Sequence, residues 1–412
     1  WENENGFFAD GRPLKILCVN ANQGGCSYYR IINPMITLAK HFGGIVNIRF
    51  DENPLGIETE GELSGQWKKD WNFEAMLWAD VVFTQNISNF GGQYTARVVG
   101  KAKEFGKFVH YDTDDLLTNL YEGHRLYEVY QDKGLGDTTK FIYNHADLVT
   151  VTQRKFAERI FPFVGKGTTL AVLKNAIDYS LPCWSSAKMM PRNKKLCRIG
   201  WAGGIHHEED VKEFAGVPPL VNQRVGSERV WWDFYGKPPP TDVENDKWQQ
   251  DVWVNYQKTI LRGFKGQKNW TLHSAMPSDQ YGVMYANMDV AIAPLQMNEF
   301  NDSKSEIKVA EAGRYSVPLV ASDVGCYDET IVNWETGVLL PPDAPRSEWV
   351  KVLKKIIQNK KLREKMGHNL HQITEKHFNI NKVVGYRLDL YDEVMKLTGH
   401  KTESDTGITF SP

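Results

Sequence analysis

The strongest constraint on the fold is a regular alternation between short apolar runs and longer stretches with helical periodicity. The runs are rich in β-branched residues and bounded by Gly, Asn or Asp, which is typical of buried strands in parallel sheets. Six runs fall in the first half, at 14–20, 45–50, 80–85, 107–112, 147–152 and 169–174. Six more follow, at 196–203, 229–236, 269–274, 289–295, 318–322 and 337–340. This alternation predicts an α/β protein with parallel sheets.

Each half has a glycine-containing turn directly after its first predicted strand. We therefore expect two doubly wound, Rossmann-like domains that face each other across a cleft. The predicted boundaries are an N-terminal domain at 1–180, a linker at 181–195 and a C-terminal domain at 196–378. Three helical segments are expected after residue 346, and the last, within 379–412, is expected to pack back onto the N-terminal domain before a short tail.

Composition narrows the class of protein further. The chain has 412 residues, with 49 Lys or Arg against 51 Asp or Glu and a formal net charge of −2. That balance disfavours a protein that coats nucleic acid through a global positive field. The sequence shows no apolar run near the roughly 20 residues that span a bilayer, and no signal-peptide pattern. Its five scattered cysteines predict buried thiols in a reducing compartment, so we expect a cytoplasmic protein.

The first glycine turn contains Gly24, Gly25 and Arg30. Glycines let the backbone approach a ligand, and the start of the following helix carries partial positive charge suited to an anion. The spacing is not G-x-G-x-x-G, so a tight turn without a ligand is an equal alternative. A nicotinamide oxidoreductase is only weakly supported.

Four polar residues at the end of the fourth predicted strand are candidate catalytic groups: His110, Asp112, Asp114 and Asp115. Ligands of open α/β sheets bind at the carboxyl ends of the strands. A carboxylate there can accept hydrogen bonds from sugar hydroxyls, act as a base or hold Mg²⁺. The alternative is an Asx turn that caps the next helix.

The second glycine turn contains Gly203, Gly204 and His207. Its glycines could cradle a diphosphate, and His207 could donate a hydrogen bond to a substrate oxygen. The acidic run 208–210 that follows suits a helix start better than a metal site. We predict no metal centre in the chain.

The segment 294–325 contains the densest group of candidate binding residues. We expect a strand that ends near residue 295, a polar loop, and a helix that begins near Ser303. On such a helix Lys304, Lys308 and Glu311 share one face, where two ammonium groups could hold a diphosphate and Glu311 could accept ribose hydroxyls. With Ser303 and Ser305 they form the candidate donor site, and the alternative is a solvated Lys/Glu face.

Together these motifs resemble the retaining glycosyltransferases of the GT-B fold known as group 1 or family 4, over most of the chain. Their order and spacing carry the resemblance more than any single piece. The pieces are Gly24-Gly25 with Tyr29-Arg30 and Pro34, Asp114-Asp115, Ala146-Asp147 before Val149-Thr150-Val151, Asn175-Ala176-Ile177-Asp178, Trp201-Ala202-Gly203-Gly204 with His207 and Asp210, residues 300–325, and Thr336-Gly337-Val338-Leu339.

The resemblance implies that the N-terminal domain binds an acceptor and the C-terminal domain a nucleotide-diphosphate sugar, with UDP or GDP as the nucleotide. It implies that Glu311 is the second of the family's paired glutamates and contacts the donor ribose. At the position of the first glutamate this sequence has Ser303. Lys304 and Lys308 resemble an alternative form of this paired-glutamate motif, in which lysines of the same helix face the cleft. His110 resembles the family's histidine after a first-domain strand, with Asp112 as the rival candidate.

The implied reaction is sugar transfer with retention, in which the leaving phosphate helps to deprotonate the acceptor. Lysines, helix N-termini and glycine amides could stabilise the departing diphosphate, so no cofactor is expected, although the pattern does not exclude Mg²⁺. The acceptor stays open between a glycan, a lipid-linked glycan, a protein, a small metabolite and a hydroxylated DNA base. The alternative functions are a non-catalytic sugar-nucleotide or glycan-binding module, an epimerase and a phosphorylase.

Overall fold

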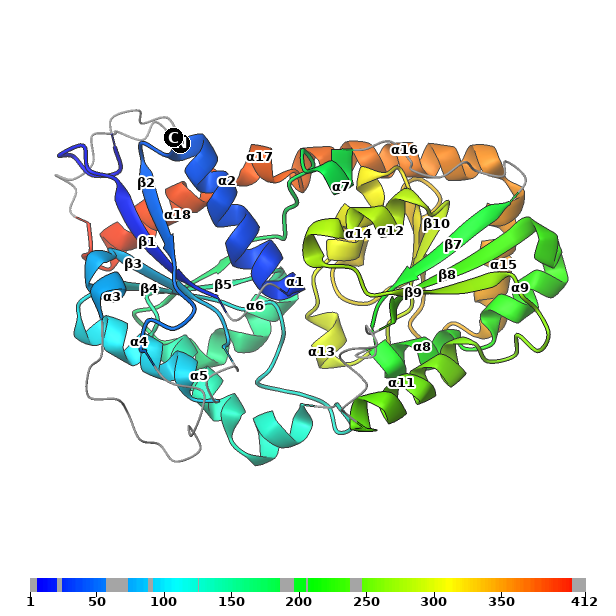
Figure 1. The fold of residues 1–412 in the computed structure, drawn as a ribbon, viewed down its shortest axis with the longest axis horizontal. Helices are drawn as coiled ribbons and strands as arrows, with labels where there is room; N and C mark the ends of the chain where they lie inside the picture. Colours follow the sequence, from blue (N-terminus) through cyan, green and yellow to red (C-terminus); the bar gives the residue numbers. More distant parts are fainter. Residues whose placement is uncertain are drawn as a thin grey trace. The chain divides into compact units, whose positions relative to one another are not determined.

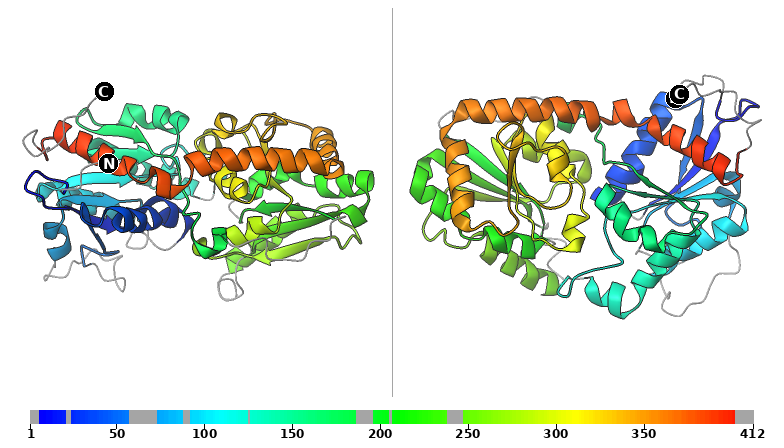
Figure 2. Two further views of the ribbon diagram at one scale, coloured as in Figure 1. Left: turned by 90° about the horizontal axis from the view of Figure 1, so that it is seen from above. Right: turned by 180° about the vertical axis from the view of Figure 1, so that it is seen from behind.

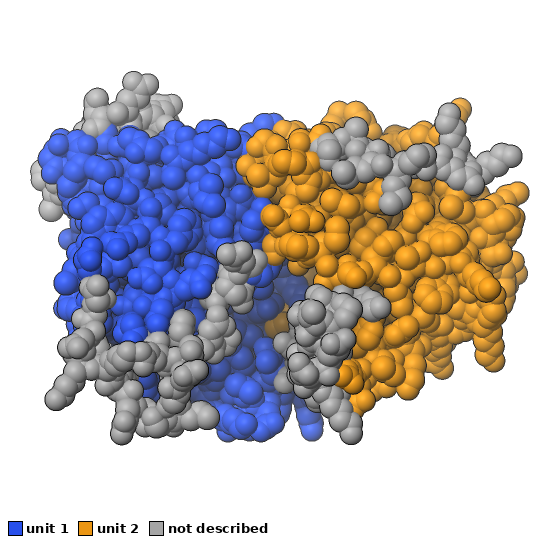
Figure 3. All heavy atoms as spheres, in the orientation of Figure 1, with its two compact units in different colours: residues 1–176, 303–305, 380–412 blue, residues 177–302, 306–379 orange. Residues whose placement is uncertain are grey.

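The computed structural model describes residues 6–20, 24–56, 73–87, 92–124, 126–185, 196–204, 207–237 and 247–401. The chain divides into two compact units (Figure 3). Unit 1 comprises Trp1–Ala176, Ser303–Ser305 and Ile380–Pro412, and unit 2 comprises Ile177–Asp302 and Glu306–Asn379. Residues 186–195 of the expected linker and 402–412 of the expected tail lie outside the described residues.

Unit 1 is built on a parallel six-stranded sheet with the strand order β2-β1-β3-β4-β5-β6 (Figure 1). Strands β3, β4 and β5 are buried along their whole length, which explains why the sequence shows them as nearly continuous apolar runs. The strands are β1 (Leu14–Val19), β2 (Val46–Phe50), β3 (Val81–Thr84), β4 (Phe108–Asp112), β5 (Leu148–Val151) and β6 (Thr169–Val172).

Helices cover both faces of this sheet. On one face, α2 and α18 share a hydrophobic core with β1 and β3, and on the other α4 contacts α5 (Figures 1 and 2). The helices are α1 (Gly25–Ser27), a π-helical turn (Tyr28–Ile32), α2 (Asn33–Phe42), α3 (Glu74–Trp78), α4 (Tyr94–Glu104), α5 (Leu135–His145), α6 (Arg154–Ile160), α17 (Ile380–Val383) and α18 (Tyr386–Leu397).

The end of the described chain is part of the unit 1 core. Ile380, Leu388, Tyr391 and Val394 are buried among apolar side chains of β1, α2 and β3. The single helix expected over this region is divided into α17 and α18, with Val384 and Gly385 between them.

Unit 2 is a second parallel six-stranded sheet, with the order β12-β11-β10-β7-β8-β9. Its strands are β7 (Cys197–Ala202), β8 (Val230–Lys237), β9 (Trp270–Ser274), β10 (Val290–Ala293), β11 (Leu319–Ser322) and β12 (Gly337–Leu340). All twelve strands therefore occur where the sequence predicts them, and the expected α/β class with two parallel sheets is confirmed.

Helices also cover both faces of the unit 2 sheet. One layer is centred on an aromatic contact in which Phe214 packs 6.2 Å from Trp232 and 5.2 Å from Trp349, measured between ring centroids. The helices are α7 (Pro182–Ser185), α8 (Glu208–Phe214), α9 (Val217–Val225), α11 (Lys247–Ile260), α12 (Gly282–Ala286), α13 (Glu299–Asp302), α14 (Ile307–Arg314), α15 (Arg346–Gln358) and α16 (Lys360–His377). No described helix combines the length and apolar character needed to cross a bilayer.

The expectation of a helix from Ser303 is wrong, because α13 ends at Asp302 and α14 begins at Ile307. Polar side chains in this region bond to α8 and to the turn at Gly325, both far away in sequence, and one continuous helix does not form. Asn301 Nδ2 donates to Asp210 Oδ1 at 2.7 Å, and Asp302 Oδ1 accepts from the Gly325 amide at 3.1 Å. Such side-chain bonds compete with helix propagation.

Helix α16 lies so close to the turn after α14 that residue 367 has room only for glycine. A Cβ atom at Gly367 would overlap the backbone carbonyl of Ser316. We expect Gly367→Ala to lower the free energy of unfolding by about 1–3 kcal/mol, because backbone atoms would have to move. Chemical denaturation measures this change.

Gly100 of α4 provides a matched control, since a Cβ atom there would meet no atom within 4 Å. Gly100→Ala should stabilise the protein by about 0.4–1 kcal/mol through the entropy of the unfolded chain. Equal effects of the two substitutions would contradict the close packing of α16.

Candidate functional site

In both sheets, the strands that follow the first one in sequence are added first on one side of it and then on its other side. The point between these two sides is the reversal point of the sheet. In unit 1 it lies between β1 and β3, and in unit 2 between β7 and β10. Ligands of doubly wound sheets bind beside the carboxyl ends of the strands at such points. The two glycine turns follow β1 and β7, so each begins at a reversal point.

In unit 1, Arg30 joins the glycine turn to the ends of two other strands. Its Nε and Nη2 atoms donate to the two carboxylate oxygens of Asp112 at 2.8 and 2.6 Å. Its Nη1 atom donates to Leu173 O at 2.6 Å and to Asn175 Oδ1 at 3.2 Å. Both side chains of the Arg30–Asp112 pair are fully buried. Gly24 and Gly25 precede this pair at the start of α1, while residues 21–23 lie outside the described chain.

His110 is also buried and bonds only to protein groups among the described residues. Thr150 Oγ1 donates its hydroxyl proton to Asp112 at 2.5 Å, so it must accept at 2.7 Å from His110 Nε2–H. His110 Nδ1 then accepts from Tyr391 of α18 at 2.8 Å, while the ring stacks on Phe83 at 4.2 Å. Burial lowers the pKa of His110 to about 3, which keeps the ring neutral.

The pKa of Asp112 reflects two opposing effects. Burial acts to raise it, but the charge of Arg30 and the hydrogen bonds from Arg30 and Thr150 outweigh burial and hold the pKa below the ordinary value. Asp112 is therefore an ionised group whose oxygens are saturated by donors of its own unit. The arrangement fits a positioning group rather than a proton carrier.

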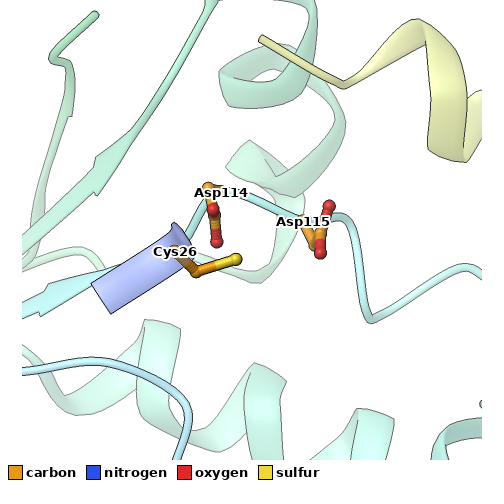
Figure 4. Close-up of side chains that lie close together, drawn as sticks. All are labelled: Cys26, Asp114 and Asp115. Atoms are coloured by element: carbon orange, nitrogen blue, oxygen red, sulfur yellow. The ribbon is translucent and has the colours of Figure 1, made fainter. Parts of the chain in front are cut away.

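Asp114 and Asp115 follow β4 and meet Cys26 of α1 (Figure 4). One ligand atom from each lies within 4.8 Å of the others, close enough for a single cation to contact all three. Burial and the adjacent Asp115 carboxyl raise the pKa of Asp114 to about 7. The charge of Asp114 in turn raises the pKa of the Cys26 thiol. These groups therefore hold protons more readily than isolated carboxyl or thiol groups do, and their oxygens can accept hydrogen bonds.

Cys26 is a site residue that the sequence did not reveal. The four other cysteines are buried as expected, but Cys26 is exposed, and the expectation of a buried thiol at this position is wrong. Its place in the glycine turn, three residues from Tyr29 and facing the Asp114–Asp115 pair, follows only from the folding of β1 beside β3 and β4.

The segment Ser303–Ser305 groups with unit 1. Ser305 Oγ accepts from Asn175 Nδ2 at 2.8 Å, and Ser303 Oγ accepts from Arg159 Nη1 at 3.1 Å. The charge of Lys304 acts on Asp115, whose pKa burial nevertheless raises. Because Lys304 precedes α14, the expected stripe of Lys304, Lys308 and Glu311 on one helix does not form.

In unit 2, Asp210 connects the second glycine turn to the loop after β10. Its Oδ2 atom lies 2.7 Å from His207 Nδ1, and its Oδ1 atom accepts from the Gln296 amide at 3.0 Å and from Asn301 Nδ2 at 2.7 Å. Nδ1 of His207 faces a carboxylate, so its proton is placed there and Nε2 is left as an acceptor when the ring is neutral. Residues 205 and 206 lie outside the described chain.

The backbone at Gly203 is held by an aromatic pair. Tyr256 of α11 accepts from Trp201 Nε1 at 2.7 Å and donates to Gly203 O at 2.7 Å. A Cβ atom at Gly203 would overlap the Trp201 ring and come within 3.1 Å of His207 Cδ2, so a side chain does not fit. Gly204 has more room, with only Gly236 O within 4 Å of an added Cβ.

Lys308 and Glu311 of α14 lie at the carboxyl end of β7. Lys308 Nζ donates to Ala202 O at 2.5 Å and lies 5.0 Å from the centroid of the Trp201 ring. Glu311 is buried and accepts from Tyr285 OH at 2.7 Å. The ammonium group therefore stands beside the residues that precede Gly203, with a buried carboxylate one turn further along the helix.

The sequence predicts donor-site roles for the glycine turn, His207, Lys308 and Glu311, and it gives no indication of Tyr256 or Tyr285, which contact Gly203 and Glu311 in the structure. Both tyrosines come from helices without a local motif, and only the folded sheet brings them to the site. Residues 255–372 match the family model described as glycosyl transferases group 1.

The chain has the two-domain GT-B fold, and its residues 255–372 match the group 1 glycosyltransferase family. The structure is similar to that of a sucrose-phosphate synthase from Thermosynechococcus elongatus, with a TM-score of 0.65 and 14% identity over 93% of this chain and 99% of that chain. It is also similar to HepE from Anabaena solved with UDP and glucose, with a TM-score of 0.64 and 13% identity over 92% and 100%.

A glycosyltransferase from Rickettsia africae has a TM-score of 0.59 and 14% identity, with 93% of this chain and 99% of that chain covered. At such identities the likeness concerns the fold alone. None of the curated proteins matches the sequence.

The buried Arg30–Asp112 pair generates a stability prediction. Asp112→Asn leaves the guanidinium of Arg30 buried without a counter-charge, so we expect the free energy of unfolding to fall by about 3–5 kcal/mol. Denaturant titration measures this change. The control is Glu158→Gln, which removes the exposed Arg154–Glu158 pair and should cost less than about 1 kcal/mol. Similar losses in both variants would show that Asp112 does not anchor the glycine turn.

Proposed function

We propose that the protein is a glycosyltransferase that transfers a hexosyl or related residue from a UDP- or GDP-sugar, and that unit 2 binds this donor. The observation that carries the proposal is the position of Lys308 Nζ at Ala202 O, directly before Gly203 and at the reversal point between β7 and β10. A cation beside glycine amides at such a point suits a diphosphate. The crystal complexes of Anabaena HepE with UDP and with UDP-glucose support a uridine nucleotide.

Four groups of unit 2 would bind the donor. The Gly204 amide would face the diphosphate, whereas the Gly203 amide donates to Tyr235 O at 3.3 Å, and Gly203 would contribute only the close approach that the lack of a side chain allows. Lys308 neutralises charge that develops on the leaving diphosphate, and His207, fixed by Asp210, presents its other ring nitrogen to the donor. Glu311 accepts hydrogen bonds from the ribose while Tyr285 holds its carboxylate in place.

Ser303, Lys304 and Ser305 receive a different proposed role, because they group with unit 1. Ser303 stands where the resemblance places the first glutamate of the paired motif, so this protein would not use a carboxylate there to contact the donor sugar. Lys304 would supply positive charge near Asp115.

Unit 1 would bind the acceptor through Asp114 and Asp115. An acceptor oxygen would form a bond to the anomeric carbon as the bond from that carbon to the diphosphate breaks, and the hydroxyl proton would pass to the leaving phosphate. Asp114 would accept a hydrogen bond from the acceptor hydroxyl and orient it. His110 and Asp112, both sealed from solvent, would position Arg30 and the glycine turn with Gly24 and Gly25.

We further propose that transfer proceeds with retention and without a metal cofactor, because Lys308 and backbone amides supply positive charge at the leaving group. The free state of all five cysteines supports a reducing compartment such as the cytoplasm. The family match favours transfer over an epimerase, a phosphorylase or a binding module. A glycan, a lipid-linked glycan, a protein and a hydroxylated DNA base are the acceptor classes to screen.

Lys308→Met tests the donor site. We expect affinity for UDP, or for GDP if that is the donor nucleotide, to fall by about 10- to 100-fold, because a charge-assisted contact to phosphate is lost. Titration calorimetry with both nucleotides and their sugar conjugates measures the change. The control is Lys212→Met on the exposed side of α8, which should bind as the parent does. Parent-like affinity of Lys308→Met would place the diphosphate elsewhere.

Asp114→Asn tests the acceptor side. The amide can no longer accept through both oxygens, so we expect kcat to fall at least about 100-fold while nucleotide affinity stays unchanged. Steady-state rates and UDP titrations separate the two effects. Asp137→Asn, at an exposed position of α5, is the matched control and should retain activity. Normal turnover by Asp114→Asn would remove Asp114 from the reaction.

A further inference from the structure

A concave surface lies in unit 2, away from the carboxyl ends of its strands. It is a groove of about 720 Å³ between α9 and α15. Leu220 and Arg224 line it from α9, and Lys351, Lys354 and Lys355 line it from α15. None of the described residues that line the groove is acidic. The proposed donor and acceptor sites use no residue of this surface.

The groove concentrates positive charge in a chain whose formal net charge is −2. From residue 346 to residue 361 the sequence has six Lys or Arg and a single Glu. Within the part of the chain that the structure describes, Arg224 and Lys354 form no ion pair. Lys351 has only a long contact of 3.4 Å to Glu348, and its side chain is 76% exposed. These charges are therefore available to a ligand.

The shape of the groove indicates the form of that ligand. Its lining on α15 runs from Ser347 to Gln358, which corresponds to roughly 17 Å along a helix. Lys351, Lys354 and Lys355 repeat at helical spacing on the face opposite the buried Trp349 and Leu353. Cations that repeat along an elongated recess fit a chain with repeated negative charges better than a single small anion.

The lining also distinguishes between classes of polyanion. None of the described lining residues is aromatic, whereas proteins that bind single-stranded nucleic acid stack bases on aromatic rings. A planar bilayer would meet the rims of a concave surface and would not follow its curve, along which the aliphatic side chains of Leu220 and Val350 also lie. An acidic carbohydrate chain satisfies both conditions, since it presents repeated charges and apolar ring faces.

We propose that the groove between α9 and α15 binds an extended acidic polysaccharide. Carboxylate, sulfate or phosphate groups on the sugar rings would contact Arg224, Lys351 and Lys354, and the ring faces would lie over Leu220. Binding depends on the charges of this groove alone and does not require the proposed donor or acceptor chemistry.

The test uses a fluorescently labelled heparin-derived oligosaccharide as the probe and the full chain. The groove variant is Lys351→Gln with Lys354→Gln. The matched control is Lys360→Gln with Lys361→Gln, which removes the same charge from the first turn of α16, outside the lining. All four positions are exposed, and circular dichroism checks that both variants are folded.

We expect the groove variant to bind the probe at least about tenfold more weakly and the control variant to bind within about twofold of the parent. The slope of log affinity against log salt concentration should fall by about one for each lysine removed from the groove. Neutral dextran should not bind.

Three results would overturn the proposal. They are an absence of binding by the parent, equal losses in the groove and control variants, and groove-dependent binding that is tighter for oligothymidylate or for phosphatidylglycerol vesicles than for the oligosaccharide. Nucleotide titrations with the same variants separate this outcome from any failure of the proposed donor site.

Discussion

The buried contact between Arg30 and Asp112 organises the carboxyl end of the unit 1 sheet. A guanidinium and a carboxylate without access to water are tolerable only when every donor and acceptor is engaged. Here Asp112 also accepts from Thr150, and Arg30 also reaches the segment after β6. Four separate strand ends are thereby fixed to one charge pair. The neighbouring Cys26, which is exposed, and the half-buried Asp114 and Asp115 owe their proximity to this fixed frame.

In unit 2 a single carboxylate fixes the loops at the carboxyl end of the sheet. Asp210 bonds to His207, to the amide of Gln296 and to Asn301, so one side chain joins the loop after β7 to the loop after β10. The Trp201–Tyr256 pair then holds the carbonyl of Gly203 from a third element. Both units thus place buried polar networks beneath a glycine turn, which keeps the backbone amides of the turn in fixed positions for a charged ligand.

Most of the fold follows from local sequence patterns. The inner strands, such as β3, β5, β10 and β11, are short apolar runs between turn-forming residues, and burial of both sheet faces makes such runs conspicuous. The start of α14 could not be predicted, because Asn301 and Asp302 bond to Asp210 and Gly325, far away in sequence. The site was predictable where it depends on residues directly after a strand. Tyr256, Tyr285 and Cys26 reach it only through tertiary packing, for which no local pattern exists.

The contribution of α17 and α18 to the unit 1 core has a consequence for the order in which the protein forms during synthesis. Unit 1 is translated first, but apolar residues from Ile380 to Met395 complete its core. Unit 2 lies wholly between these two parts of the chain and is interrupted only by residues 303–305, which belong to unit 1. A ribosome therefore releases all of unit 2 before unit 1 can bury β1 and β3 on both faces. The nascent chain carries an unfinished apolar surface for most of its synthesis, and such surfaces are the ones that chaperones recognise.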